Sequence, residues 1–197
     1  MVKTSVRSEQ PPKRHNEKVL NMATIPSVCD FDWQAPDFLL PDTAGTPTSF
    51  KDIQGENGTL IMFICNHCPY VLGVLDHILR DASDLQNLGI GVAAISANDV
   101  AAYPQDSFEN MGELARAHQF SFPYLYDETQ DTARAYDAAC TPDFFGFNKA
   151  GGLQYRGRFE GSNRDLFEAM KSIAETGQGP RDQIPSMGCS IKWKSEL

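Results

Sequence analysis

The centre of this chain is the stretch LIMFICNHCPY, residues 60–70. Its first part, residues 60–64, is a continuous apolar run, which suits a strand buried on both faces of a sheet. Cys65 and Cys68 then form a Cys-x-x-Cys pair, and Pro69 begins a helical pattern. A buried strand, a tight turn with two thiols and a helix N-terminus form the arrangement that dithiol redox chemistry requires. The same pair could also be half of a metal site.

The chain on either side of this centre shows regular patterns. Apolar residues at helical spacing from Val71 to Leu88 predict one long helix, with Gly89 as its C-cap. Before the centre, residues 38–50 predict a short hairpin with a turn at 42–45. After it, the patterns predict strands at residues 90–96, 124–126, 143–147 and 153–159, and helices at 107–120, 129–139 and 162–173.

The order of these elements indicates the fold class. Strands that alternate with helices imply a parallel sheet with helices on both faces, and the late pair of strands adds an antiparallel edge. We therefore predict an α/β fold with a mixed central sheet. Arg156 and Arg158 alternate with aromatic residues and predict the solvent face of the last strand. Ser162 and Asp165 have the spacing of a capping box at the start of the last helix.

Length and composition predict one folded domain with a segment at each end. The 197 residues are 41% hydrophobic and 22% charged, which is typical of a globular protein. Residues 1–22 are polar and basic without periodicity and predict a disordered arm. We expect the domain over residues 23–178. The tail, 179–197, contains Ile191 and Trp193 and could dock onto it.

Charge and hydropathy argue against several classes of partner. A net charge of -9 disfavours nucleic acid, because phosphate binding needs a basic face. No apolar stretch approaches the ~20 residues that span a bilayer, so we expect no membrane partner. The basic N-terminus lacks the apolar block of a secretory signal, and we expect a cytoplasmic protein.

The cysteines favour redox chemistry over a disulfide framework or a metal site. Five scattered cysteines are too few to staple a small secreted fold. A structural zinc site usually takes its four ligands from two separated pairs, and this sequence has one close pair, so we predict no metal and no cofactor. The cysteines are Cys29, Cys65, Cys68, Cys140 and Cys189.

Four groups of residues carry a resemblance to a known family. They are Ala35-Pro36-x-Phe38-x-Leu40-x-Asp42, Cys65-x-x-Cys68-Pro69, Tyr124-x-x-Asp127-Glu128 and Thr141-Pro142-Asp143-Phe144-Phe145. Over residues 35–176 the chain resembles the thioredoxin-fold superfamily, in its redoxin branch of peroxiredoxins and alkyl hydroperoxide reductases (AhpC/TSA). It is most similar to a peroxiredoxin-like subfamily with Cys-x-x-Cys where true peroxiredoxins have one peroxidatic cysteine. The resemblance implies a thioredoxin-like fold with the N-terminal hairpin of redoxins, and a cis Thr141–Pro142 bond that faces the dithiol.

The chain also departs from these families. Peroxiredoxins have Pro-x-x-x-Thr-x-x-Cys, and counting back from Cys68 places Ile61 and Cys65 at the proline and threonine positions. Counting back from Cys65 fits no better, so the hydroxyl that would orient a peroxide is missing. Thioredoxin has a buried aspartate six residues before its first cysteine, where this chain has Thr59. An acid that assists proton transfer must therefore come from elsewhere.

The resemblance and the helix N-terminus together suggest roles for the site residues. Cys65 is the predicted nucleophile, because orphan N–H groups at the start of a helix stabilise a thiolate. Cys68 would be more buried and would resolve the mixed disulfide. His67 could stabilise the thiolate further and raise the reduction potential above the ~-270 mV of thioredoxin, or it could simply face solvent. The predicted supporting residues are Asn66, His67, Pro69, Thr141 and Pro142.

The remaining thiols and the function stay open at this point. Cys140 could trap or resolve the dithiol, or it could be a small buried hydrophobe, and Cys189 could act as a resolving thiol. The leading hypothesis is a thiol-disulfide oxidoreductase that acts on protein or small-molecule thiols and disulfides and is reset by an external thiol reductant. The alternatives are a thiol peroxidase that reduces hydroperoxides, and a redox-sensing or metal-binding module.

Overall fold

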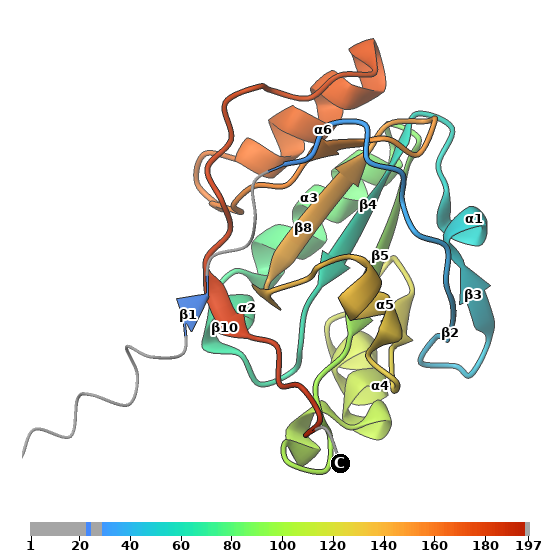
Figure 1. The fold of residues 1–197 in the computed structure, drawn as a ribbon, viewed down its shortest axis with the longest axis vertical. Helices are drawn as coiled ribbons and strands as arrows, with labels where there is room; N and C mark the ends of the chain where they lie inside the picture. The colour runs from blue at the N-terminus through green and yellow to red at the C-terminus, as the bar shows by residue number, and fades with distance from the viewer. Residues whose placement is uncertain (1–22, 25–28, 196–197) are drawn as a thin grey trace, which may run out of the picture.

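The computed structural model describes residues 23–24 and 29–195. Its central sheet contains, in spatial order, β6 (Tyr124–Tyr126), β5 (Ile90–Ser96), β4 (Gly58–Phe63), β8 (Asp143–Phe147) and β9 (Leu153–Tyr155). Figure 1 labels its three middle strands, β5, β4 and β8. The first three strands are parallel to one another, and β8 is antiparallel to both β4 and β9. The predicted mixed α/β sheet is confirmed.

Helices cover both faces of the sheet. One face carries α3 (Leu75–Gln86), α4 (Phe108–Ala117) and α6 (Asp165–Thr176), and the other carries α1 (Phe50–Ile53) and α5 (Asp131–Ala135). All of β4 is buried, because its successive side chains point to opposite faces and both faces are covered. Leu60 and Met62 pack with the first group of helices, and Ile61 and Phe63 pack with the second.

The hairpin before the sheet forms as predicted. β2 (Leu39–Pro41) pairs antiparallel with β3 (Pro47–Ser49), and the Asp42 carboxylate accepts hydrogen bonds from two backbone N–H groups of the connecting turn. Ser49 and Asp52 then make a capping box that starts α1.

The predicted helix from Val71 to Leu88 is wrong, because it is two helices. α2 (Pro69–Leu72) ends at Gly73, and α3 begins after Val74, whose ψ of 4° leaves the helical region. Glycine is a poor helix former, and the two pieces pack on different elements, α2 on the C-terminal strand and α3 on β5. Gly89 has φ +75° and lies two residues past the actual C-cap, Asn87.

Two local predictions around the last strand are also wrong. Arg156 was expected in solvent, but β9 ends at Tyr155. The Arg156 side chain is only 5% exposed and forms an ion pair with Asp143. The capping box does not form, because α6 has Arg164 as its N-cap, in the left-handed region and without a side-chain cap bond.

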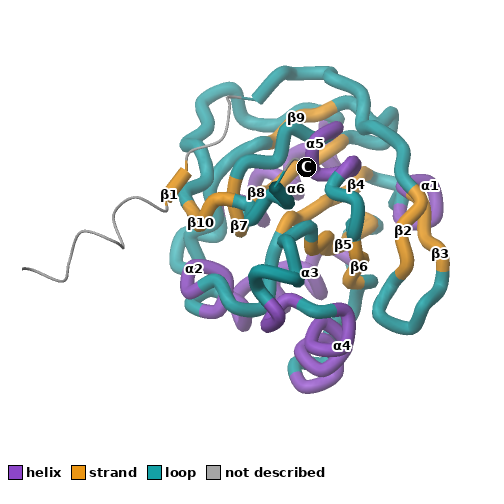
Figure 2. The backbone as a smooth tube through the Cα atoms, turned by 60° about the horizontal axis from the view of Figure 1, so that its bottom comes forward, coloured by secondary structure: helices purple, strands orange, loops and turns teal. Residues whose placement is uncertain are grey.

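The C-terminal segment packs against the fold. β10 (Gly188–Ser190) pairs with β1 (Ala23–Thr24) on one side and with β7 (Cys140–Thr141) on the other. In Figure 2 these strands lie side by side next to α2. Ile191 is buried in the core, so residues beyond 178 contribute to it. The predicted arm, residues 1–22, lies outside the described residues. Among the described helices none is long and apolar enough to cross a membrane.

Candidate active site

The two thiols lie where the buried strand β4 ends and α2 begins. Ile64 still bonds to β5 through its N–H and the Ile95 carbonyl, 3.0 Å apart, so the strand is anchored up to the residue before Cys65. Cys68 is the N-cap of α2, and Pro69 occupies its first turn, where a backbone N–H would have no helical partner. Both cysteines are free and buried, Cys65 at 1% and Cys68 at 0% exposure. Solvent exposure does not separate the two thiols, so the expected greater burial of Cys68 stays a prediction.

Thr141 contacts both thiols. Its hydroxyl Oγ1 lies 3.4 Å from the Cys65 sulfur, and its carbonyl oxygen accepts a hydrogen bond from the Cys68 sulfur at 3.2 Å. The Thr141–Pro142 bond is cis, as the resemblance implied. The loop between β7 and β8 therefore faces the Cys-x-x-Cys turn, although 73 residues separate Cys68 from Thr141.

The electrostatic difference between the thiols is the reverse of the predicted one. The hydrogen bond from Cys65, which outweighs the opposing effect of burial, lowers the pKa of Cys68 to about 4, and the N–H of Val71 adds to this. The pKa of Cys65 is raised by its bond to Cys68, by burial and by the negative charge of Asp106. The position of Cys68 adds to the difference, because Cys68 is the N-cap of α2 and the N–H of Val71 in the first turn lowers its pKa.

A buried carboxylate organises the two residues between the cysteines. Asp106 is fully buried, and its two oxygens bond to the backbone N–H of Asn66 at 2.8 Å and to Nδ1 of His67 at 2.7 Å. The Asn98 amide also donates to it, at 2.8 Å. On the other side, the His67 ring stacks on Tyr103, with centroids 5.4 Å apart.

Sequence reasoning missed Asp106. It lies in a short 3₁₀ helix, η1 (Pro104–Asp106), that follows β5 by several residues. A signal was available, because the carboxyl ends of neighbouring parallel strands meet at one edge of a sheet and collect functional groups there. β4 and β5 are such neighbours. The sequence could therefore have predicted that the polar segment after β5 lies beside the dithiol.

The same residues could hold a metal ion. One ligand atom each from Cys65, His67 and Asp106 lies within 4.8 Å of the others. The carboxylate oxygens of Asp106, however, already accept three hydrogen bonds, from Asn66, Asn98 and His67. An ion bound through the same oxygens would have to displace part of this network.

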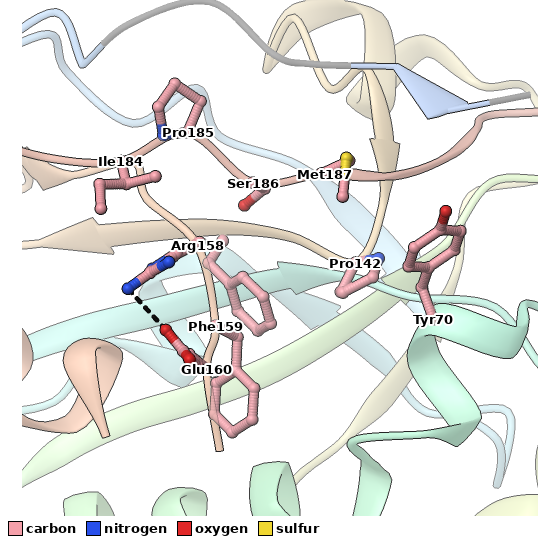
Figure 3. Close-up of a pocket in the computed structure, with 10 residues that line it drawn as sticks. Tyr70, Pro142, Arg158, Phe159, Glu160, Ile184, Pro185, Ser186 and Met187 are labelled. Atoms are coloured by element: carbon pink, nitrogen blue, oxygen red, sulfur yellow. Dashed lines mark ion pairs between the residues drawn. The ribbon is translucent and has the colours of Figure 1, made fainter. Parts of the chain in front are cut away.

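An apolar groove of about 460 Å³ adjoins the site at Pro142. Residues 184–187 run along one side and residues 158–160 along the other, with Tyr70 and Pro142 at one end (Figure 3). The side chains that remain most exposed on it are those of Tyr70, Ile184 and Met187. An apolar surface beside the dithiol is a place where a partner can dock.

The other three cysteines differ in how they relate to the site. Cys189 lies in β10 opposite Thr141, is partly exposed, and packs against the buried cluster that contains Cys68. Cys140 is buried, and its sulfur lies 3.5 Å from the Pro142 carbonyl. Cys29 packs against the core cluster on the other face of the sheet and lines a small cavity with Arg156 and Gln183.

The sheet, the cis proline and the dithiol before a helix define a thioredoxin-fold protein. The chain belongs to the AhpC/TSA family, whose profile matches residues 32–159. No curated protein matches the chain.

Solved structures resemble it along most of its length. An uncharacterized conserved protein from Geobacillus kaustophilus is 40% identical, with a TM-score of 0.84 over 89% of this chain and 98% of that one. A hypothetical protein from Sinorhizobium meliloti is 33% identical, with a TM-score of 0.84 over 88% of this chain and 100% of the other. The thioredoxin domain of a thiol-disulfide oxidoreductase from Bacteroides vulgatus shares the fold, at 14% identity and a TM-score of 0.61 over 75% and 99%.

Proposed function

We propose that the protein is a thiol-disulfide oxidoreductase that uses Cys65 and Cys68. The observation that carries the proposal is the pair of buried thiols that both contact Thr141 at the junction of a buried strand and a helix. A thiolate is the reactive form of cysteine, and the lowered pKa of Cys68 supports this residue as the attacking group. Membership of a thioredoxin-like redoxin family is consistent with this chemistry.

The reaction proceeds in two exchanges. The Cys68 thiolate attacks a disulfide of the substrate; a bond between Cys68 and one substrate sulfur forms, and the other substrate sulfur leaves as a thiolate and takes up a proton. Cys65 then loses its proton and attacks Cys68, which forms the Cys65–Cys68 disulfide and releases the second substrate thiol. The substrate gains two electrons, and the pair loses two. An external thiol reductant restores the pair, and we expect this to occur in the cytoplasm.

His67 and Asp106 are suited to handle the proton of Cys65. The imidazole and the carboxylate are joined at 2.7 Å, and one ligand atom of each lies within 4.8 Å of the Cys65 sulfur. The imidazole can accept the proton that Cys65 releases as it becomes a nucleophile. This pair takes the place of the buried acid that thioredoxin has at the position of Thr59.

Cysteine variants test the assignment. With a protein disulfide as substrate, the double variant Cys65→Ser/Cys189→Ser is expected to accumulate a mixed disulfide, because the attacking thiol Cys68 remains and neither neighbouring thiol can resolve it. Cys68→Ser is expected to lose turnover without this intermediate, and Cys29→Ser serves as the control. Turnover that survives in Cys68→Ser would contradict the proposal.

The apolar groove supports a polypeptide substrate. Ile184→Asp would place a charge on the exposed wall of the groove without touching either thiol. We expect kcat/KM for a protein disulfide to fall about tenfold, while the rate with glutathione disulfide stays the same. An equal loss for both substrates would mean that the groove does not bind a polypeptide.

A thiol peroxidase is the second candidate. Cys68 has the lower pKa of the pair, which favours oxidation of its thiolate to a sulfenic acid by a hydroperoxide, with release of water or an alcohol. Cys65 would then condense with it, releasing water and forming the same disulfide. Stopped-flow rates with hydrogen peroxide and with a disulfide substrate separate the two functions, and metal analysis of freshly purified protein tests the metal-binding alternative.

A further inference from the structure

A third thiol stands beside the dithiol, at the end of the fold where the C-terminal strand returns. β10 pairs antiparallel with β7, and the partner of Cys189 in this pairing is Thr141. The carbonyl oxygen of Thr141 is the atom that accepts a hydrogen bond from Cys68. Cys68 and Cys189 are therefore both neighbours of Thr141, one through a hydrogen bond and the other through strand pairing.

The sulfur of Cys68 has two thiol partners. Cys65 belongs to the same buried cluster as Cys68, Cys189 packs against that cluster, and both thiols lower the pKa of Cys68. The backbones of β10 and β7 approach each other closely next to Cys189: a Cβ atom at Gly188 would lie 2.2 Å from the Thr141 carbonyl oxygen. Just after β10, the N–H of Ile191 donates a hydrogen bond to the Ala139 carbonyl, so the backbone is also held on the C-terminal side of Cys189.

Exposure separates the three sulfurs. Cys65 and Cys68 are closed to solvent, whereas Cys189 is partly exposed on β10. Cys140 does not share this position, because the next register pair places it opposite Ser190 and its sulfur is directed at the Pro142 carbonyl. Side chains alternate along a strand, so neighbouring Cys140 and Thr141 point to different sides.

We propose that Cys189 is a third redox cysteine, which exchanges with the Cys65–Cys68 disulfide and carries the oxidising equivalent to the surface. This rests on the proposed function of the pair. The Cys189 thiolate attacks Cys68; the Cys68–Cys189 bond forms, the Cys65–Cys68 bond breaks, and Cys65 leaves as a thiolate that takes up the proton lost by Cys189. No electrons are gained or lost in this step. An external thiol then attacks Cys189 and, with a second thiol equivalent, reduces the new disulfide.

The charges around Cys189 favour exchange after the pair is oxidised. In the reduced protein, burial first and then the bond and charge of Cys68 raise the pKa of Cys189 to about 11, while Lys192 opposes them. Once Cys68 is part of a disulfide it carries no charge and no proton, so both of its contributions are lost. The Cys189 thiolate forms more readily at that stage.

Disulfide mapping tests the exchange. The intact protein and the variants Cys65→Ser, Cys189→Ser and Cys140→Ser are oxidised with glutathione disulfide, their free thiols are alkylated at low pH, and their peptides are identified by mass spectrometry. We expect Cys65–Cys68 and Cys68–Cys189 bonds in the intact protein and in Cys140→Ser. We expect only Cys65–Cys68 in Cys189→Ser, and Cys68–Cys189 in Cys65→Ser, whose fold is checked by circular dichroism.

Reduction kinetics supply a second readout. Starting from oxidised protein, the rate of reduction by glutathione is expected to be about tenfold lower in Cys189→Ser than in Cys140→Ser, because the exposed sulfur is absent. Equal rates, or a Cys65→Ser protein that forms no Cys68–Cys189 bond, would overturn the role of Cys189 and leave the proposed function intact. Intact protein that forms no Cys65–Cys68 bond would overturn the proposed function itself.

Discussion

A single carboxylate sets much of the chemistry at the site. Asp106 is fully buried, and it fixes the backbone of Asn66 and the ring of His67 between the two cysteines. Its negative charge also disfavours a thiolate on Cys65. The sequence predicted that His67 changes the reduction potential. That effect also depends on the negative charge of Asp106, which is bonded to the imidazole ring. That prediction stays a prediction until the potential is measured.

Replacing this charge is expected to make Cys65 more reactive. In Asp106→Asn the repulsion of a Cys65 thiolate is lost, so the pKa of Cys65 falls. With Cys68→Ser in the background, so that Cys65 is the thiol of the pair that remains, the rate of alkylation of Cys65 at fixed pH should rise about tenfold. Asp99→Asn, in the same segment, is the control. A rate that is unchanged or lower in Asp106→Asn would contradict the assigned charge effect.

At the scale of elements, a buried ion pair joins strand β8 to the segment that follows β9. Its first residue, Asp143, is fully buried and lies 3.3 Å from Arg156, which also packs over the Phe145 ring, 4.7 Å from its centroid. Burial raises the pKa of Asp143 to about 6, against the opposing charge of Arg156. Removal from water therefore outweighs the attraction of the partner.

This pKa predicts how stability changes with pH. The ordinary pKa of Asp is 3.8, so between about pH 4 and pH 6 the folded protein binds more protons at Asp143 than the unfolded chain does. Its free energy of unfolding should then fall as the pH rises, by up to about 3 kcal/mol from this group. Denaturant unfolding at several pH values checks this. Asp143→Asn should remove that component, and Asp182→Asn, which changes an exposed carboxyl, should not.

Two glycines should respond to alanine with opposite signs. A Cβ at Gly91 in β5 would lie 1.7 Å from the Ile53 carbonyl oxygen, so Gly91→Ala should lower the free energy of unfolding by about 2–4 kcal/mol. Gly112 in α4 has open space, its nearest neighbour being Thr43 at 3.9 Å, and alanine is the better helix former. Gly112→Ala should raise the free energy by about 0.5–1 kcal/mol. A similar effect at both positions in urea titrations would be inconsistent with these contacts.

At the scale of the whole molecule, one aromatic side chain joins segments that are far apart in the chain. Tyr136 packs edge-on against Trp33, with centroids 5.8 Å apart, and also contacts Phe63 of β4 at 5.6 Å. Its hydroxyl donates a hydrogen bond to the Pro36 carbonyl, 100 residues earlier in the chain. The segment before β2 is held to the sheet in this way.

Truncation at this position should separate packing from hydrogen bonding. Tyr136→Phe removes one hydrogen bond and should lower the free energy of unfolding by about 1 kcal/mol. Tyr136→Ala also leaves a cavity and should lower it by about 3–5 kcal/mol. Both values come from chemical denaturation. If the two variants differed by less than a kcal/mol, the ring would not hold the layers together.

The sequence by itself determined the features that depend on neighbouring residues. Apolar runs gave the positions of β4 and β5, turn residues gave the hairpin, and residues 65–69 gave two thiols before a helix. The alternation of these elements gave the fold class, and the resemblance gave the cis bond before Pro142. Each rests on local periodicity or on a motif of a few residues.

Only the tertiary structure decided what lies against the dithiol. Asp106 reaches Asn66 across 40 residues and Thr141 reaches Cys68 across 73, and Cys189 arrives from a strand at the other end of the chain. Asp106 and Cys189 modify the pKa difference that the contact between Cys65 and Cys68 sets, and no pattern near residue 65 records these two groups. The physical reason is that electrostatic and thiol contacts act through space, so they depend on how the sheet and its connections bring distant segments together.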